Sequence, residues 1–377
     1  TNHKYDTTDY FEIDRHFGDK EVFANLVEEA HKRGIKIMLD AVFNHIGYQS
    51  AQWQDVLKNG EKSPSKDWFH IQEFPVTEDK LQNPRELPYH TFAFASYMPK
   101  LNTANPEVRD YLLSVATYWI ENFDIDAWRL DVANEIDHQF WKDFRKAVLA
   151  KKPDLYILGE IWHTSQPWLQ GDEFHAVMNY PLSESIKDYF LRQRKKTEQF
   201  ISEINSQSMY YKQQISEVMF NLLDSHDTER ILTTAKGNIQ HVKAALTFLY
   251  LQKGTPCIYY GTELALIGGP DPDCRRVMPW DRVSEDNDML NFMKKLIKVR
   301  KEVASIIQHG NYHLEEVEPD VIVLEWTYER KEVQAIFNQS KENFVLDRDS
   351  VDLSSHCQVK EGQQIILPDG FVVYISE

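Results

Sequence analysis

The feature that most constrains the fold of this chain is a repeated alternation of amphipathic helix patterns with short apolar runs, between about residues 19 and 300. Residues 19–34 have helical periodicity, and residues 35–45 follow as a β-branched apolar run. Further strands are expected at residues 125–133, 155–162, 176–182, 218–227 and 254–263. Such alternation is typical of a parallel sheet covered by helices, so we predict an α/β fold.

The number of strand–helix units specifies the architecture further. About six can be counted, whereas a closed TIM-type (β/α)8 barrel needs eight. The first two strands are therefore expected upstream of Thr1, and the opening "TNHKYDTTDY" has no Met or apolar leader. We predict four parts: barrel at 1–45, an inserted loop subdomain at 46–100, barrel again at 101–306, and an antiparallel β-domain at 307–377.

Composition excludes several classes of partner. The 377 residues include 42 Lys and Arg against 59 Asp and Glu, which gives a net charge of −17. That balance argues against nucleic acid and against an anionic membrane surface. Three cysteines without zinc-ligand spacing are typical of reduced thiols in a cytosolic protein. We predict a cytoplasmic protein with a neutral or cationic ligand.

Four strand patterns end in polar residues that a sheet interior would not select. The carboxyl ends of parallel strands form the active-site face of such folds, so these side chains should converge. A single strand-end aspartate is often a helix cap, and a single histidine is often structural, but capping does not account for four successive cases. The four groups are Asp40, Asn44 and His45; Arg129 and Asp131; Glu160, Trp162 and His163; Asp224, His226 and Asp227.

The chemistry that best fits these groups is glycoside cleavage. It needs one carboxylate as nucleophile and one carboxylic acid as proton donor, about 5–5.5 Å apart in retaining enzymes. The chain has no Gly-rich phosphate loop and no G-x-S-x-G motif. A metal site formed by the strand-end His and Asp residues stays an alternative. Arg129 and Asp131 lie on one side of a strand, so we expect the arginine to keep Asp131 ionised.

The motifs "DAVFNH", "WRLDVANE", "LGEIWH" and "LLDSHD" resemble the four short regions of the α-amylase superfamily. "MPKLNT", "VMNYPL" and "GGPDPDCRRVMPWD" are similar to those of its neopullulanase, cyclomaltodextrinase and maltogenic amylase group. The resemblance covers nearly the whole chain. It implies a retaining hydrolase that cleaves α-1,4 bonds, and also α-1,6 bonds, in cyclodextrins, maltooligosaccharides, pullulan or starch, with some transglycosylation.

The resemblance also implies roles for individual residues. Asp131 matches the nucleophile, Glu160 the general acid/base, and Asp227 the third carboxylate, which holds sugar hydroxyls. Tyr5 matches a tyrosine that stacks under the −1 sugar, and His45 and His226 match two histidines that donate to the hydroxyls of that sugar. Trp162 and Glu135 match residues on the acceptor side. Three neighbours complete the substrate-binding positions: Asp6, Asn44 and Arg129.

Some positions depart from the group's pattern. Arg15 replaces a proline in "DRHFG", Ala127 replaces a glycine, and Thr164 replaces an aspartate. Relatives carry an N-terminal β-domain and two barrel strands before "NHKYD", and this domain completes a partner's active site in a dimer. We therefore expect a homodimer for the full-length form. No cofactor is expected to be required, although a structural calcium is compatible with the full-length protein.

Two alternative functions stay open. One is an exo-acting α-1,6-glucosidase, but that group has a different fifth region and lacks "VANE". The other is a catalytically inert, truncated sugar-binding relative. Such relatives typically lose catalytic carboxylates, whereas all three are present here.

Overall fold

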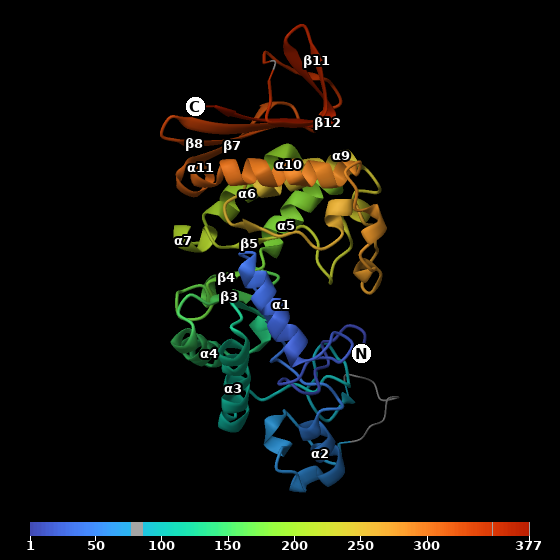
Figure 1. The fold of residues 1–377 in the computed structure, drawn as a ribbon, viewed down its shortest axis with the longest axis vertical. Helices are drawn as coiled ribbons and strands as arrows, with labels where there is room; N and C mark the ends of the chain where they lie inside the picture. The colour runs from blue at the N-terminus through green and yellow to red at the C-terminus, as the bar shows by residue number, and fades with distance from the viewer. Residues whose placement is uncertain (77–85, 349, 377) are drawn as a thin grey trace. The chain divides into compact units, whose positions relative to one another are not determined.

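The computed structural model describes residues 1–76, 86–348 and 350–376 (Figure 1). These residues form two compact units. The first unit comprises residues 1–161 and 165–177, and the second comprises residues 162–164 and 178–377.

Helices of the first unit begin at side-chain caps. Asp19 accepts a hydrogen bond from the main chain of Val22, and Asn105 caps a helix that opens with Pro106. Helices α3 and α4 pack side by side (Figure 1). The helices are α1 (Lys20–Lys32), α2 (Ala51–Asn59), α3 (Pro106–Phe123) and α4 (His138–Lys151), with 3₁₀ turns η1 (Gly60–Lys62), η2 (Lys66–Trp68), η4 (Ala133–Glu135) and η5 (Gln166–Trp168).

Four short strands form the parallel sheet of the first unit, in the order β1-β2-β3-β4. They are β1 (Met38–Ala41), β2 (Ala127–Leu130), β3 (Tyr156–Gly159) and β4 (Ala176–Val177). The register places Asp40 beside Arg129, and Arg129 beside Leu158. Each strand is shorter than the apolar run that predicts it. The chain leaves the sheet within a few residues and enters the loops that carry the polar strand-end groups.

The described residues 46–76 and 86–100 are more regular than the sequence predicts. Ser50 caps the nine-residue helix α2, which is too short for its periodicity to stand out in the sequence. Trp53 is fully buried and packs its ring against Phe69 and Tyr89, each at a centroid distance of 4.7 Å. A bridge between His45 and Lys100 joins the two ends of the segment. The described part of this segment therefore has a small aromatic core.

The second unit begins with helices around a second parallel pair. Strands β5 (Phe220–Asn221) and β6 (Thr255–Pro256) pair in parallel, so the described residues contain six parallel strands, as the sequence predicts. The helices are α5 (Tyr180–Ile186), α6 (Thr197–Ser208), α7 (Gln213–Ser216), α8 (Ile231–Thr234), α9 (Ile239–Tyr250), α10 (Asp288–Glu302) and α11 (Ala304–His309), with the π-helical turn η6 (Lys187–Leu191) and 3₁₀ turns η7 (Thr262–Leu264), η8 (Asp273–Arg275) and η9 (Trp280–Arg282).

A six-stranded antiparallel sheet completes the second unit. Its order is β10-β12-β9-β8-β7, with β11 paired to β12. One face packs on α9, α10 and α11, and rings such as Phe248 and Phe337 meet in this core (Figure 1). The strands are β7 (Asn311–Glu318), β8 (Val321–Tyr328), β9 (Lys331–Asn338), β10 (Phe344–Leu346), β11 (Leu353–Lys360) and β12 (Gln363–Ser376).

Candidate active site

The centre of the candidate site in the first unit is the buried guanidinium of Arg129. Its Nη1 donates to Oδ1 of Asp131 at 2.7 Å and to both carboxylate oxygens of Asp40 at 2.9 Å. Its Nη2 lies 2.9 Å from Oε1 of Glu160, although the N–H bonds of Nη2 do not align with that oxygen. One cation therefore contacts three carboxylates.

The sheet backbone fixes these side chains. The main-chain N–H of Asp131 donates to Ala41 at 3.1 Å, and that of Glu160 donates to Leu130 at 2.9 Å. Both carboxylates therefore follow the ends of neighbouring parallel strands, as the sequence predicts. Asp40, at the end of β1, was a strand-end candidate but was not assigned a role at the site. Only the parallel register brings it to Arg129, which is 89 residues away in the chain.

A strained turn holds Glu160 from the other side. Oε2 of Glu160 accepts a hydrogen bond of 3.0 Å from the main-chain N–H of Val132. Val132 has φ 46°, a left-handed conformation that costs a β-branched residue about 1–3 kcal/mol. The indole of Trp141 donates to Ala133 at 2.8 Å and anchors the same turn. The backbone thus directs one N–H at the carboxylate expected to act as acid and base.

The charges at this centre do not balance. Burial raises the pKa of Asp131 to about 8; Arg129 lowers that pKa, and the neighbouring carboxylates of Asp40 and Glu160 raise it further. The expectation that Arg129 alone keeps Asp131 ionised is therefore incomplete, because burial and two like charges outweigh the guanidinium. Burial also raises the pKa of Asp40, so the carboxyl groups of Asp131 and Asp40 retain a shared proton near neutral pH.

Tyr5 and His45 lie beside this centre. The Tyr5 hydroxyl donates to Asp40 at 3.0 Å, and the guanidinium of Arg129 lies 5.9 Å from the centre of the Tyr5 ring. Nε2 of His45 is 2.9 Å from the carbonyl of Tyr5, so that nitrogen carries the ring proton. Burial lowers the pKa of His45 to about 4, which keeps the ring neutral. His45 therefore fixes Tyr5, whereas the resemblance implies a donor to sugar hydroxyls.

Asp6 and Asn44 support the same segment. The hydroxyl of Thr1 donates to Oδ1 of Asp6 at 2.5 Å, and a Cβ on Gly47 would lie only 2.2 Å from the carbonyl oxygen of Asp6. Asn44 is buried next to His45, and its Oδ1 has no hydrogen-bond partner among the described residues. Within those residues, no group of three or more His, Cys, Asp or Glu side chains could hold a metal ion.

Glu135 lies at the edge of the first unit's group. Nζ of Lys100 contacts Oε2 of Glu135 at 3.0 Å and its carbonyl at 3.1 Å. Lys100 itself forms the bridge to His45. This ion pair connects the "VANE" turn to the segment that contains "MPKLNT". The sequence relates both motifs to the same group of enzymes and assigns Glu135 to the site, but it does not predict their contact.

His226 and Asp227 lie together in the second unit. Nε2 of His226 is 3.1 Å from Oδ2 of Asp227, and Nη2 of Arg275 is 3.4 Å from Oδ1 of Asp227. Nε of Arg275 and the thiol of Cys274 both donate to the carbonyl of His226, each at 3.0 Å. The motif "GGPDPDCRRVMPWD", which contains Arg275, resembles the group's pattern but indicates no role at the site. Its sequence carries no periodic signal for these contacts, which span about 48 residues.

Asp224 and Arg230 anchor the loop that carries His226 and Asp227. Asp224 is buried and accepts from the main chain of Ile231 at 3.2 Å and from the hydroxyl of Thr262 at 2.9 Å. Burial raises the pKa of Asp224 to about 6. Asp224 is therefore a structural acceptor, which is the alternative that strand-end aspartates allow.

Arg230 is fully buried, and its role was not predicted from the sequence. Its Nε donates to Cys274 at 2.8 Å, its Nη1 donates to the carbonyl of Tyr260, and its guanidinium lies 3.9 Å from the ring centre of Tyr259. Arg230 follows Asp227 by three residues. Its side chain joins the loop that carries Asp227 to two segments that lie later in the chain. It is a positioning residue.

Trp162 also lies in the second unit. Its indole is 47% exposed and stacks on Tyr180, with ring centres 3.9 Å apart and planes within 8°. The ring is thus held in one orientation while one face meets solvent. Nδ1 of His163, next along the chain, donates to the carbonyl of Thr164 at 3.0 Å. None of the described helices is long and apolar enough to cross a membrane.

Comparisons with known proteins agree with these motifs. Residues 1–302 match the family described as alpha amylase, catalytic domain. The chain is 54% identical over 341 residues to the intracellular maltogenic amylase of Bacillus subtilis, covering 90% of this chain and 57% of that protein. It is 50% identical over 344 residues to a cyclomaltodextrinase of Geobacillus thermopakistaniensis, covering 91% and 58%. The chain thus spans less than two thirds of these curated relatives.

A solved structure confirms the predicted fold class. The ligand-free cyclic α-maltosyl-(1→6)-maltose hydrolase from Arthrobacter globiformis aligns with a TM-score of 0.89 at 33% identity. The alignment covers 100% of this chain and 82% of that one. An α-amylase-type barrel fold with a C-terminal antiparallel β-domain is therefore the fold of this chain. With four motifs at strand ends, the charge centre at Arg129 and these matches, the chain belongs to the alpha-amylase catalytic domain family.

Proposed function

We propose that this chain carries the catalytic centre of a retaining α-glucan hydrolase of the cyclomaltodextrinase and neopullulanase type. The single observation that supports it most is the guanidinium of Arg129, which contacts both Asp131 and Glu160. Two carboxylates on one guanidinium are close together, and retaining hydrolases need a short separation of about 5–5.5 Å. The chain spans 57% of the maltogenic amylase that it matches, so the activity of the whole protein is also a proposal.

The reaction has two displacements. Asp131 attacks the anomeric carbon while Glu160 gives its proton to the departing glycosidic oxygen, which forms a glycosyl–enzyme ester. Glu160 then takes a proton from water, the resulting hydroxide attacks the same carbon, and the Asp131 carboxylate leaves. Arg129 and the N–H of Val132 hold the carboxyl groups of Asp131 and Glu160 in place for these steps.

The other residues bind and orient the sugar. Tyr5 stacks under the −1 glucose and is fixed by His45 and Asp40. By its resemblance to the third carboxylate of the family, Asp227 holds sugar hydroxyls, with His226 beside it. Trp162 and Glu135 shape the acceptor side. Asp6 and Asn44 keep the Tyr5 and His45 segments in place.

The substrates proposed are α-1,4-linked: cyclodextrins, maltooligosaccharides, pullulan and starch. Cleavage of α-1,6 bonds is a second candidate activity, which the likeness to a cyclic α-maltosyl-(1→6)-maltose hydrolase favours. We infer a cytoplasmic location from the relative named as intracellular and from the three unpaired cysteines. A homodimer without a required cofactor, with structural calcium restricted to a longer form, completes the proposal.

The test is release of reducing ends from β-cyclodextrin, with panose as the α-1,6 substrate. Asp131→Asn should abolish turnover while the melting temperature stays close to that of the wild type. Asp110→Asn, on the exposed side of α3, is the matched control and should leave turnover unchanged. Turnover by Asp131→Asn near the wild-type rate would exclude this mechanism. Binding of cyclodextrin without turnover in the unsubstituted protein would indicate the inert sugar-binding alternative.

A further inference from the structure

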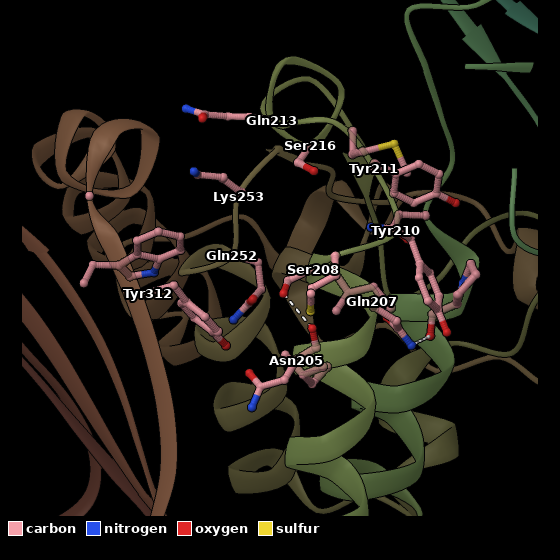
Figure 2. Close-up of a pocket in the computed structure, with 18 of the residues that line it drawn as sticks. Asn205, Gln207, Ser208, Tyr210, Tyr211, Gln213, Ser216, Gln252, Lys253 and Tyr312 are labelled. Carbon is pink, nitrogen blue, oxygen red and sulfur yellow. Dashed lines mark hydrogen bonds between the residues drawn. The ribbon is translucent and has the colours of Figure 1, made fainter. Parts of the chain in front are cut away.

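The second unit contains a cavity of about 560 Å³, a size typical of small-ligand sites. It lies where the end of α6 and the segment before α7 face the residues before β6 and the strands β7 and β8. Figure 2 shows Tyr210 and Tyr211 on one side of the space, with Lys253 and Tyr312 on the other. No residue given a catalytic or sugar-binding role above lines it.

The lining of this cavity is nearly uncharged. Of the nineteen described residues that line it, Lys253 alone carries a charge. Charged residues make up 27% of the chain, so about five would be expected. The protein has a net charge of −17, yet none of the described residues that line this space carries a carboxylate. A lining of this kind suits a neutral ligand, because it offers a cation or an anion little charge pairing.

The polar groups that remain are amides and hydroxyls. Six of the lining residues are Asn or Gln. The side-chain amide of Asn205 makes no hydrogen bond within the described part of the chain, and it is exposed beside Ser208 (Figure 2). In contrast, Gln207 is fixed by a 3.0 Å bond to Ser185. An amide both donates and accepts, and so does a sugar hydroxyl, which makes the two natural partners.

Rings provide the apolar part of the lining. Tyr312 and Trp326 pack with ring centres 4.8 Å apart, and the indole N–H of Trp326 donates to Leu251 at 2.8 Å. Those two rings are therefore held in place. Tyr210 is 40% exposed, and its ring lies perpendicular to that of Tyr211 at 6.4 Å. Exposed tyrosine rings offer flat apolar faces with a polar edge, which matches the faces and rim of a pyranose.

We propose that this cavity is a second carbohydrate site that binds a short, neutral α-glucan of about two or three glucose units. The choice of an α-glucan, among neutral polyhydroxylated ligands, rests on the proposed function. None of the bond-cleaving residues lines this cavity, so it binds sugar without turnover. Stacking on Tyr210 and hydrogen bonds to Asn205 carry the interaction.

The experiment titrates maltotriose into the Asp131→Asn protein by calorimetry, which counts sites in the absence of hydrolysis. Two classes of site are expected. Ser208→Trp places a large side chain at the cavity wall and should weaken the second class at least tenfold. Ser206→Trp, two residues earlier on α6, exposed and outside the lining, should retain both classes. Tyr210→Ser removes a ring without adding bulk and should match Ser208→Trp.

The outcomes separate this inference from the proposed function. A single class of site in every variant, with β-cyclodextrin hydrolysis intact when Asp131 is present, would overturn the cavity site and leave the function standing. Binding that is lost in Ser208→Trp and Tyr210→Ser, in a protein that hydrolyses no α-glucan, would support the cavity and reject the function. Equal loss in Ser206→Trp would attribute the effect to α6 as a whole and would overturn the site.

Discussion

Arg129 and Asp131 are two residues apart in the chain and 2.7 Å apart in space, joined by a hydrogen bond from Nη1 to Oδ1. The pair is buried, and two more carboxylates, from Asp40 and Glu160, contact the same guanidinium. The properties of the site therefore depend on how one positive charge is divided among three acids. Substitutions that change this shared charge, or the contacts around it, should therefore have measurable effects on stability and turnover.

Replacing Arg129 should damage both stability and turnover. Arg129→Met leaves three carboxylates without their cation, so the free energy of unfolding at neutral pH should fall by about 3–5 kcal/mol. Turnover of β-cyclodextrin should fall at least about 100-fold, because Asp131 loses the charge that lowers its pKa. The stability loss should shrink toward about pH 4, where carboxyl groups are protonated. Urea unfolding at several pH values measures it.

Arg129→Lys is the control for charge alone. It keeps one positive charge but cannot contact all three acids in the geometry of a planar guanidinium. We expect an intermediate stability and a turnover well below wild type. A lysine variant as active as the wild type would show that net charge, and not geometry, is what the site requires.

The raised pKa of Asp131 has a defined effect on stability. Its folded-state value of about 8 lies above the unfolded value of about 3.9, so the folded protein binds more protons between these limits. The contribution is complete below about pH 4 and is lost as pH rises through about 8, so the free energy of unfolding should fall over that window. Asp131→Asn should flatten the profile. Asp224 titrates in both proteins and cancels.

Unfolding by urea from about pH 5 to about pH 8 checks this difference. If the profiles of the wild type and Asp131→Asn run parallel, the shared proton does not reside at Asp131 in the free protein.

Gly47 should tolerate no side chain. A Cβ there would lie 2.2 Å from the carbonyl oxygen of Asp6, so Gly47→Ala must displace the Tyr5–Asp6 segment. We expect a loss of about 1–3 kcal/mol in the free energy of unfolding. A fall of about tenfold in kcat/KM should accompany it, since Tyr5 moves relative to Asp40.

Gly269→Ala is the matched control, because its Cβ would meet only Oδ2 of Asp273, at 3.5 Å. It should leave the free energy of unfolding and kcat/KM nearly unchanged. Equal effects at Gly47 and Gly269 would mean that the close approach to Asp6 is relieved at little cost.

Arg230 should affect catalysis through position. Arg230→Lys cannot donate to both Cys274 and Tyr260, so the loop with Asp227 should shift. We expect kcat on cyclodextrin to fall about tenfold, with a stability loss of about 1–3 kcal/mol. Arg300→Lys is the comparison, since Arg300 also donates to three main-chain carbonyls but lies on α10.

Arg300→Lys should lose stability and retain kcat. If both lysine variants lose kcat equally, the effect of Arg230 is general destabilisation and not loop positioning.

The sequence predicts much of this fold because the apolar periodicities are local. The helical pattern over residues 19–34 contains α1, and the strand expected at residues 125–133 contains β2. Strand length is predicted less well: the run at 218–227 contains only the two residues of β5. Apolar side chains continue beyond β5 because they are buried in loops and helix contacts, and a period of two cannot distinguish these from ladder residues.

At the site, too, the sequence predicts local relationships but not contacts between distant parts of the chain. Period-two geometry predicts that Arg129 and Asp131 share a side, and the structure confirms that contact. The contacts of Asp40 with Arg129 depend on pairing across 89 residues, and Arg230 acts through carbonyls, which have no sequence signature. The proton position on His45 follows from its distance to Tyr5, a tertiary fact. Chain-local patterns cannot encode such relationships.

The left-handed turn at Val132 has a consequence for how this protein can be engineered. Screens for thermostability favour substitutions that relax strained backbone, and Val132 is a natural target because its φ is 46°. The same conformation directs the N–H that Glu160 accepts. A variant selected at Val132 for heat resistance alone would therefore tend to gain thermostability and lose turnover. Libraries designed to improve both properties should keep Val132 unchanged.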